Sequence, residues 1–165
     1  MTTPSSVLRD GFARHAWASL RLLDALEDLG TTVPQDRLPG TYGPILRTMT
    51  HLVDADDRYL QRMTMPVLQA FEDHGAQPVA ELRPRVRAHT SRWADALDHL
   101  ETGSLHVQIT GRPDYPEIDR AEPLLFLQAL YHGDEHRAQI CSTLGAAELT
   151  VPDLSVWSFW EDQRA

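Results

Sequence analysis

The chain has 165 residues, of which 42% are hydrophobic and 24% charged, and its formal net charge is −9. This size and composition predict one globular domain spanning residues 1–165. The acidic balance argues against nucleic acid or an anionic membrane as the main partner, because phosphate binding needs a positive surface. No apolar run approaches the length of a membrane span, and no secretory signal is visible. The single cysteine forms no internal disulfide, which suits a cytoplasmic location.

Apolar residues at helical spacing predict four helices. Pro44 and Pro123 fit the first turns of the second and fourth helices, where proline is tolerated. Gly30 can end the first helix. In the third helix, the apolar stripe is formed by Leu82, Val86, Thr90, Trp93, Leu97 and Leu100. The expected boundaries are residue 5 or 6 to residue 29, Pro44 to Met63, about residue 78 to Leu100, and about Pro123 to Gly145.

The remaining segments are a connection and a tail. Residues 105–109 alternate between apolar and polar side chains, and residues 111–114 have the composition of a turn, so a short strand or hairpin is expected there. The tail, residues 146–165, holds an aromatic cluster that either packs over an end of the helices or covers a dimer surface. Long helices with short links predict an all-α four-helix bundle. The longer connection between the third and fourth helices allows a crossover.

His132 and His136 lie four residues apart on the fourth predicted helix. Their imidazoles therefore project from the same side, one turn apart. They continue the inward-facing line of Leu125, Ala129 and Ile140. Two neutral imidazoles in this arrangement supply half of a divalent-metal site. The alternative is a pair of core histidines with ordinary hydrogen bonds, because the pair alone does not define a site.

A third ligand must come from another part of the chain. His51 is the most attractive candidate, since it lies in the second predicted helix and begins an acidic run. On a helical wheel, His51 falls on the flank of the apolar stripe and Asp56 near its middle. Asp56 is either a partly exposed carboxylate or a group that binds metal, orients a histidine or accepts a substrate proton. The histidines outside the pair are His15, His51, His74, His89, His99 and His106.

Three segments carry short motifs: residues 15–23 read HAWASLRLL, residues 50–56 read THLVDAD, and residues 132–139 read HGDEHRAQ. In this order and separation they resemble the W-A-N-x-R-L-L, A-H-(I/V)-x-D-A-E and H-x-x-x-H-R-G-Q motifs of the DinB/YfiT-like superfamily of four-helix metalloproteins. The resemblance covers most of the chain. The sequence departs from the family at His15, where Tyr or Asn is frequent, and at Ala138, where Gly is usual.

The resemblance implies a metal site made of His51, His132 and His136. Three protein ligands leave one coordination position for water or substrate, as in catalytic zinc sites. The ion would lower the pKa of a bound water or thiol. Imidazole suits several metals, and we expect one divalent ion, zinc or nickel, with iron as the further option. Characterised relatives use low-molecular-weight thiols such as bacillithiol or mycothiol, so a thiol cosubstrate is also implied.

Other polar residues near these motifs are candidates for the chemistry. Glu135 is either a base or fourth ligand or, since adjacent helix positions point about 100° apart, an exposed residue. Arg137 either receives an anionic substrate group or pairs with Asp134 or another carboxylate. His15 either adds a polar group near the site or lies at the surface or its boundary. Three acidic residues are predicted to form mostly a solvated face: Asp54, Asp56 and Asp57.

These features give one leading hypothesis and two alternatives. The leading hypothesis is a metalloenzyme that activates a thiol for transfer to a small electrophile. The first alternative is hydrolysis by metal-activated water, which requires a general base, with Asp56 or Glu135 as candidates. The second is a noncatalytic protein in which the ion ties the second and fourth helices together and the aromatic tail supports a homodimer.

Overall fold

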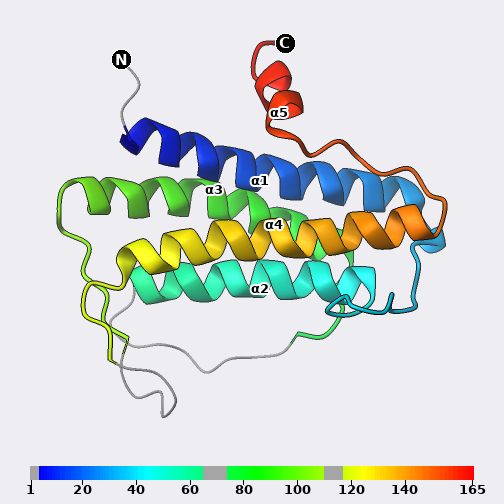
Figure 1. Cartoon of the computed structure of the whole chain (residues 1–165), viewed down its shortest axis with the longest axis horizontal. Coiled ribbons are helices and arrows are strands. Elements are labelled where there is room, and N and C mark those ends of the chain that lie inside the picture. Colours follow the sequence, from blue (N-terminus) through cyan, green and yellow to red (C-terminus); the bar gives the residue numbers. More distant parts are fainter. Residues whose placement is uncertain (1–3, 65–73, 110–116) are drawn as a thin grey trace.

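The computed structural model of the chain describes residues 4–64, 74–109 and 117–165. In these ranges the regular structure is all helical, with five α-helices, one short 3-10 helix and no strand. Figure 1 shows the four long helices lying side by side. The all-α prediction is therefore confirmed, and the long helices begin and end close to the expected residues. They are α1 (Pro4–Leu29), α2 (Ile45–Thr64), α3 (Val79–Glu101) and α4 (Glu122–Ala146).

The ends of the helices follow their local sequence. Helix α1 ends at Leu29, and Gly30 opens the 3-10 helix η1 (Gly30–Thr32) with a φ of +52°. Glycine adopts this left-handed conformation without the strain that a side chain adds. Pro44 precedes α2, and its carbonyl oxygen accepts a hydrogen bond from the Thr48 amide at 2.9 Å.

The four long helices run in two directions. Helices α1 and α4 run one way, and α2 and α3 run the other way (Figure 1). Helix α1 packs against α3, and α4 packs against α2. Helix α1 also contacts α4. The longer connection between the third and fourth helices, which allowed a crossover, joins antiparallel helices, whereas the consecutive pair that runs parallel is α2 and α3 (Figure 1). A link's length limits the distance it can span but does not set its direction.

Two apolar cores fill the interior, one toward each end of the long helices. Between them lies a polar layer, which we define as His15, Asp56, His89 and Arg137, one residue from each long helix and all buried. His89 takes the interior position of α3 that the sequence assigned to Thr90, which is exposed. The first core is built around Phe12, Leu60, Trp93 and Phe126, and the second around Leu23, Leu52, Val86 and Ile140.

The connection between α3 and α4 returns on itself, as expected. Leu105, Val107 and Ile109 are buried, whereas the residues between them are exposed. Ile109 and Ile118 form an isolated antiparallel bridge with two backbone hydrogen bonds of 2.9 Å. The turn predicted at residues 111–114 lies outside the described residues.

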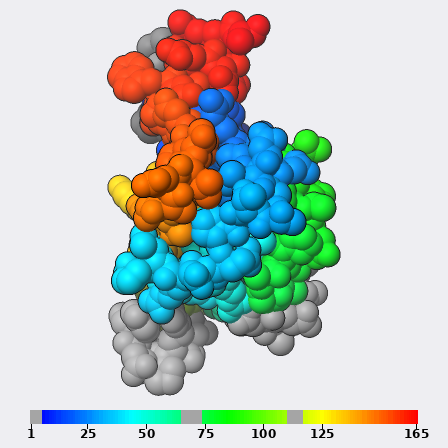
Figure 2. All heavy atoms as spheres, turned by 90° about the vertical axis from the view of Figure 1, so that its right-hand side faces the viewer, coloured from blue at the N-terminus to red at the C-terminus, as the bar shows by residue number. Residues whose placement is uncertain are grey.

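The tail contains a fifth helix, α5 (Val156–Asp162), which the sequence pattern did not predict. Ser155 caps it by accepting a hydrogen bond from the Ser158 amide at 3.1 Å. Phe159 is buried and meets the ring of Trp17 edge-on at 5.5 Å, whereas Trp157 is 79% exposed. Figure 2 shows this C-terminal segment at one edge of the molecule. Among the helices described, none has both the length and the apolar character that crossing a membrane requires.

Candidate metal centre

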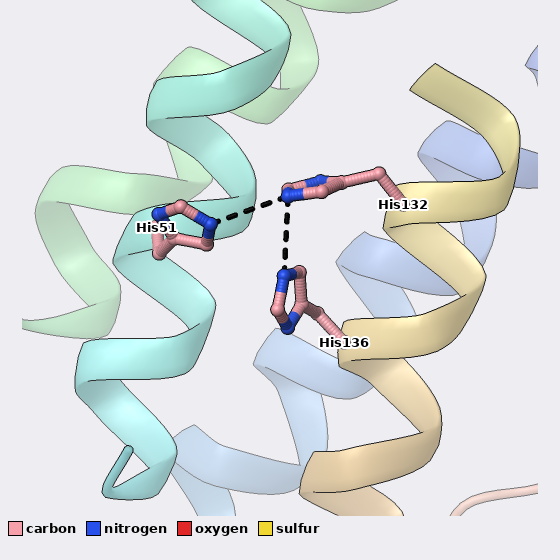
Figure 3. Close-up of side chains that lie close together, drawn as sticks. All are labelled: His51, His132 and His136. Carbon is pink, nitrogen blue, oxygen red and sulfur yellow. Dashed lines mark hydrogen bonds between the residues drawn. The ribbon is translucent and has the colours of Figure 1, made fainter. Parts of the chain in front are cut away.

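Three histidines converge between α2 and α4 (Figure 3). The Nε2 atom of His132 lies 3.2 Å from Nε2 of His51 and 3.1 Å from Nε2 of His136. One ligand atom from each residue lies within 4.8 Å of the other two. Two nitrogens bound to a tetrahedral zinc ion at about 2.05 Å would be about 3.3 Å apart. The donor set and its spacing therefore fit a single divalent ion.

Gln139 selects the tautomer of the His136 ring. Its side-chain oxygen accepts a hydrogen bond from the backbone N–H of Tyr42 at 2.9 Å and lies 3.2 Å from Nδ1 of His136. Because the Tyr42 amide can only donate, the atom facing both groups is the oxygen, and Nδ1 of His136 must carry the proton. The lone pair on Nε2 then points toward the other two histidines, as metal binding requires.

His132 is neutral at physiological pH. Burial, followed by the neighbouring imidazoles of His136 and His51, lowers the pKa of His132 to about 4. A neutral ring has a lone pair to offer a cation. Its Nδ1 atom is buried and has no hydrogen-bond partner among the described residues. The ring is held instead by packing, including an edge-on contact with Tyr59 at 6.1 Å.

Tyr42 covers one side of the three histidines. Its ring stacks on His51 with centroids 4.0 Å apart and an interplanar angle of 16°, and it meets His136 edge-on at 5.4 Å. Tyr42 belongs to the segment between η1 and α2. In Figure 2 this segment lies over the near end of the molecule, beside the C-terminal part of α4. Approach to the histidines from this side is therefore restricted.

A cleft of about 590 Å³ opens beside the histidines and includes His51 and His132 in its wall. This volume is in the range of pockets that take small organic molecules. The two histidines put the convergence point of the three nitrogens within reach of a molecule in the cleft. The other lining residues are Ala55, Arg58, Tyr59, Arg62, Ile109, Ile118, Leu124, Leu125 and Gln128.

Asp56 orients a histidine, but that histidine is His15. Nε2 of His15 lies 2.8 Å from Oδ2 of Asp56, and Nδ1 of His15 lies 3.3 Å from Nη2 of Arg137. Arginine can only donate, so Nδ1 accepts, and the N–H at Nε2 donates a hydrogen bond to Asp56. His15 is 2% exposed, which excludes the surface position considered for it. Asp56 is neither in the three-histidine group nor among the described residues lining the cleft.

The prediction that the acidic run forms a solvated face is wrong. Asp54 and Asp56 are buried, and Asp57 binds three side chains of α3. Burial alone would raise the pKa of Asp57, but hydrogen bonds from His89, Arg85 and Arg92 hold it well below its usual value. The sequence could not show this, because the partners lie on another helix.

Arg137 is buried and forms hydrogen bonds within the protein. It is 2% exposed and donates to Asp134 at 2.6 Å and to the Ser19 hydroxyl at 2.9 Å. The predicted pairing with Asp134 is confirmed, whereas Arg137 is not among the residues described as lining the cleft. Glu135 is exposed and likewise does not line the described cleft.

Several residues were not assigned a role in the site from the sequence. Gln139 follows His136 by three residues, a spacing that places both on one helix face. Tyr42 lies in a connecting segment, where no periodicity marks a functional residue. Arg58 and Arg62 belong to an ordinary polar helix face in sequence. Comparison of the chain with protein-family models and with curated proteins finds no match.

Proposed function

We propose that the protein is a DinB-like four-helix metalloenzyme that transfers a low-molecular-weight thiol to a small electrophile. His51, His132 and His136 would hold one divalent ion, zinc or nickel. The observation that carries the proposal is the spacing of their Nε2 atoms, 3.1 and 3.2 Å, beside a cleft that reaches two of the three rings. The thiol and the family are proposed from the resemblance of the three sequence motifs.

The residues around the three histidines would leave one coordination position of a bound ion open to the cleft. A divalent ion on three neutral imidazoles keeps its double charge and lowers the pKa of a bound thiol or water. Gln139 keeps the Nε2 lone pair of His136 directed inward. Tyr42 shields one side of the site through its stacking on His51. A cosubstrate therefore approaches from the cleft.

The distribution of carboxylates favours thiol chemistry over hydrolysis. A free thiol has a pKa of about 8.5, so a modest lowering yields thiolate near neutral pH, whereas hydrolysis gains from a general base within hydrogen-bond reach of the attacking water. Asp56 is engaged by His15, and Glu135 is exposed. No carboxylate is among the described residues lining the cleft.

Tyr59 supplies a neutral polar group to the cleft. Burial is the main cause that raises the pKa of Tyr59, and a hydrogen bond with Gln128 opposes the shift. The hydroxyl thus stays protonated throughout the physiological range. Both side chains line the cleft, where they can orient a polar substrate without taking its proton.

Thiol binding to cobalt-substituted protein tests the proposal. Cysteine, bacillithiol and mycothiol would each be titrated, and a sulfur-to-cobalt charge-transfer band is expected to rise saturably with at least one of them. The same thiol should then be transferred to 1-chloro-2,4-dinitrobenzene by the zinc or nickel protein. His51→Ala should abolish both signals, whereas His99→Ala, outside the cluster, should retain them. A cobalt-loaded protein whose spectrum no thiol changes would refute thiol transfer.

A further inference from the structure

The cleft beside the three histidines is lined by both charged and apolar side chains. Helix α2 contributes a row of lining residues that runs from His51 through Ala55 and Arg58 to Arg62. These positions are three or four residues apart and so share one face of the helix. The two arginines are the only formally charged side chains among the described residues that line the cleft.

Most of the lining residues outside α2 are apolar. They include Leu124 and Leu125 from α4 and the bridged pair Ile109 and Ile118. Leu125 and Ile109 are buried, and Leu124 is 47% exposed. A molecule in the cleft would therefore meet both hydrocarbon and guanidinium groups.

The positions of the arginines on α2 set their distance from the metal site along the helix axis. Arg58 is seven residues beyond His51, which corresponds to about 10 Å along the helix axis. Helical side chains lean toward the N-terminus of their helix, so both arginines lean back toward His51. A ligand that reaches the metal site and the guanidinium groups together must be an extended molecule rather than a small ion.

The charge of the cleft contrasts with that of the whole chain. The formal net charge is −9, so an anion is repelled by most of the surface. Two arginines one turn apart line the cleft, and guanidinium groups bind carboxylates and phosphates through paired hydrogen bonds. The two arginines therefore favour a ligand that carries a negative group at one end.

We propose that the cleft binds an extended amphiphilic oxyanion, with its anionic group on Arg58 and Arg62 and its apolar body against Leu124, Leu125 and Ile109. The inference rests on the proposed function, because it assigns the electrophilic substrate of that reaction to this chemical class. The reacting end of the molecule lies toward His51 and His132. The oxyanion is a carboxylate or a phosphate, which present the same chemistry to the two guanidinium groups.

Binding of three six-carbon probes tests this inference. Hexanoate, hexyl phosphate and the neutral hexanamide would be titrated into the full chain, and binding followed by calorimetry and by amide chemical shifts. At least one anion is expected to bind about tenfold more tightly than hexanamide, as charge-assisted hydrogen bonds of this kind would give. The tighter of the two anions identifies the source. Equal affinity for all three probes would overturn the inference.

Arginine variants locate the interaction. Arg58→Gln and Arg62→Gln should each weaken anion binding severalfold, and the double variant by about tenfold, with hexanamide binding unchanged. Arg87→Gln, an exposed position on α3, is the matched control and should leave both unchanged. Full anion affinity in the double variant would overturn the inference, since the anion would then bind elsewhere, including the metal ion.

Metal content separates this inference from the proposed function. The titrations would be run on the wild-type protein before and after loading with zinc or nickel, with bound metal measured in each. Arginine-dependent anion binding in wild-type protein that takes up no metal after loading would refute the metalloenzyme and support the anion cleft. A metal-loaded protein that binds hexanoate and hexyl phosphate no better than hexanamide would refute the cleft assignment alone.

Discussion

The imidazole of His15 on α1 packs directly against the backbone of Gly133 on α4. A Cβ atom added at position 133 would overlap Cε1 of His15 and would lie 3.1 Å from Nη1 of Arg137. Because Gly133 has no side chain, the His15 ring fits against α4, and the polar layer can form. This contact couples the helix that carries two candidate metal ligands to the hydrogen bond between His15 and Asp56.

Gly133→Ala should lower the free energy of unfolding. Relieving the overlap requires moving a buried and hydrogen-bonded ring, which costs about 1–3 kcal/mol, more than the gain of up to about 1 kcal/mol from helix propensity. The measurement is urea unfolding followed by circular dichroism. Gly11→Ala is the matched control, because a Cβ there makes an ordinary contact of 3.7 Å with Leu130. Equal effects of the two substitutions would contradict the close-packing account.

Because of Asp57, the free energy of unfolding should fall as the pH is lowered into the acid range. The pKa of Asp57 is lowered in the folded protein, so its contribution is complete above the unfolded value, about 3.9, and is lost as the pH falls through the folded value. Asp57→Asn should cost about 1–3 kcal/mol at pH 7, and the difference from the wild type should shrink below pH 4. Unfolding free energies from pH 7 to pH 3 check this, with exposed Asp95→Asn as control. A difference that stays constant down to pH 3 would speak against the Asp57 network.

Gln139→Leu should weaken metal binding without unfolding the protein. Loss of the hydrogen bond to Nδ1 of His136 frees the ring to rotate or change tautomer, and losing such a partner typically costs about 10–100-fold in metal affinity. Competition with a chromophoric chelator measures the affinity. Glu135→Gln, on the exposed side of the same helix, should leave it unchanged. Wild-type affinity in Gln139→Leu would show that His136 does not depend on this bond.

Tyr42→Ala should speed metal release. Removing the ring that stacks on His51 takes away an aromatic contact of about 0.5–1.5 kcal/mol, which corresponds to a change of about twofold to tenfold in rate. Tyr42→Phe retains the ring and the backbone amide that binds Gln139, so release should match the wild type. Chelator-induced release in a stopped-flow instrument compares the three proteins. Identical rates in all three would refute a covering role for Tyr42.

The sequence predicted most of the long helices because periodicity and end signals agree there. Pro44 and Gly30 mark ends that the structure places within a residue of expectation. Helix α5 was missed, since its seven residues are too few to show a period and its main start signal is the side chain of Ser155. The directions of α2 and α3 also depend on packing between distant segments, which local patterns do not contain.

The candidate site was predictable where one helix determines the geometry. The spacing of His132 and His136 sets their common side, and the flank position of His51 is compatible with facing a neighbouring helix. The environment of Asp57 was not predictable, because its partners come from α3. The same limit applies to Tyr42, whose position depends on how the segment before α2 folds over the site.

Metal content is the most direct test of the central claim that His51, His132 and His136 share one ion. Elemental analysis after zinc or nickel loading and desalting should find about one ion per chain in the wild type and in His99→Ala, and almost none in His51→Ala, His132→Ala or His136→Ala. Circular dichroism would verify that each variant is helical. An undiminished metal content in folded His51→Ala would contradict the account, because the ion would then not depend on the ligand that links α2 to α4.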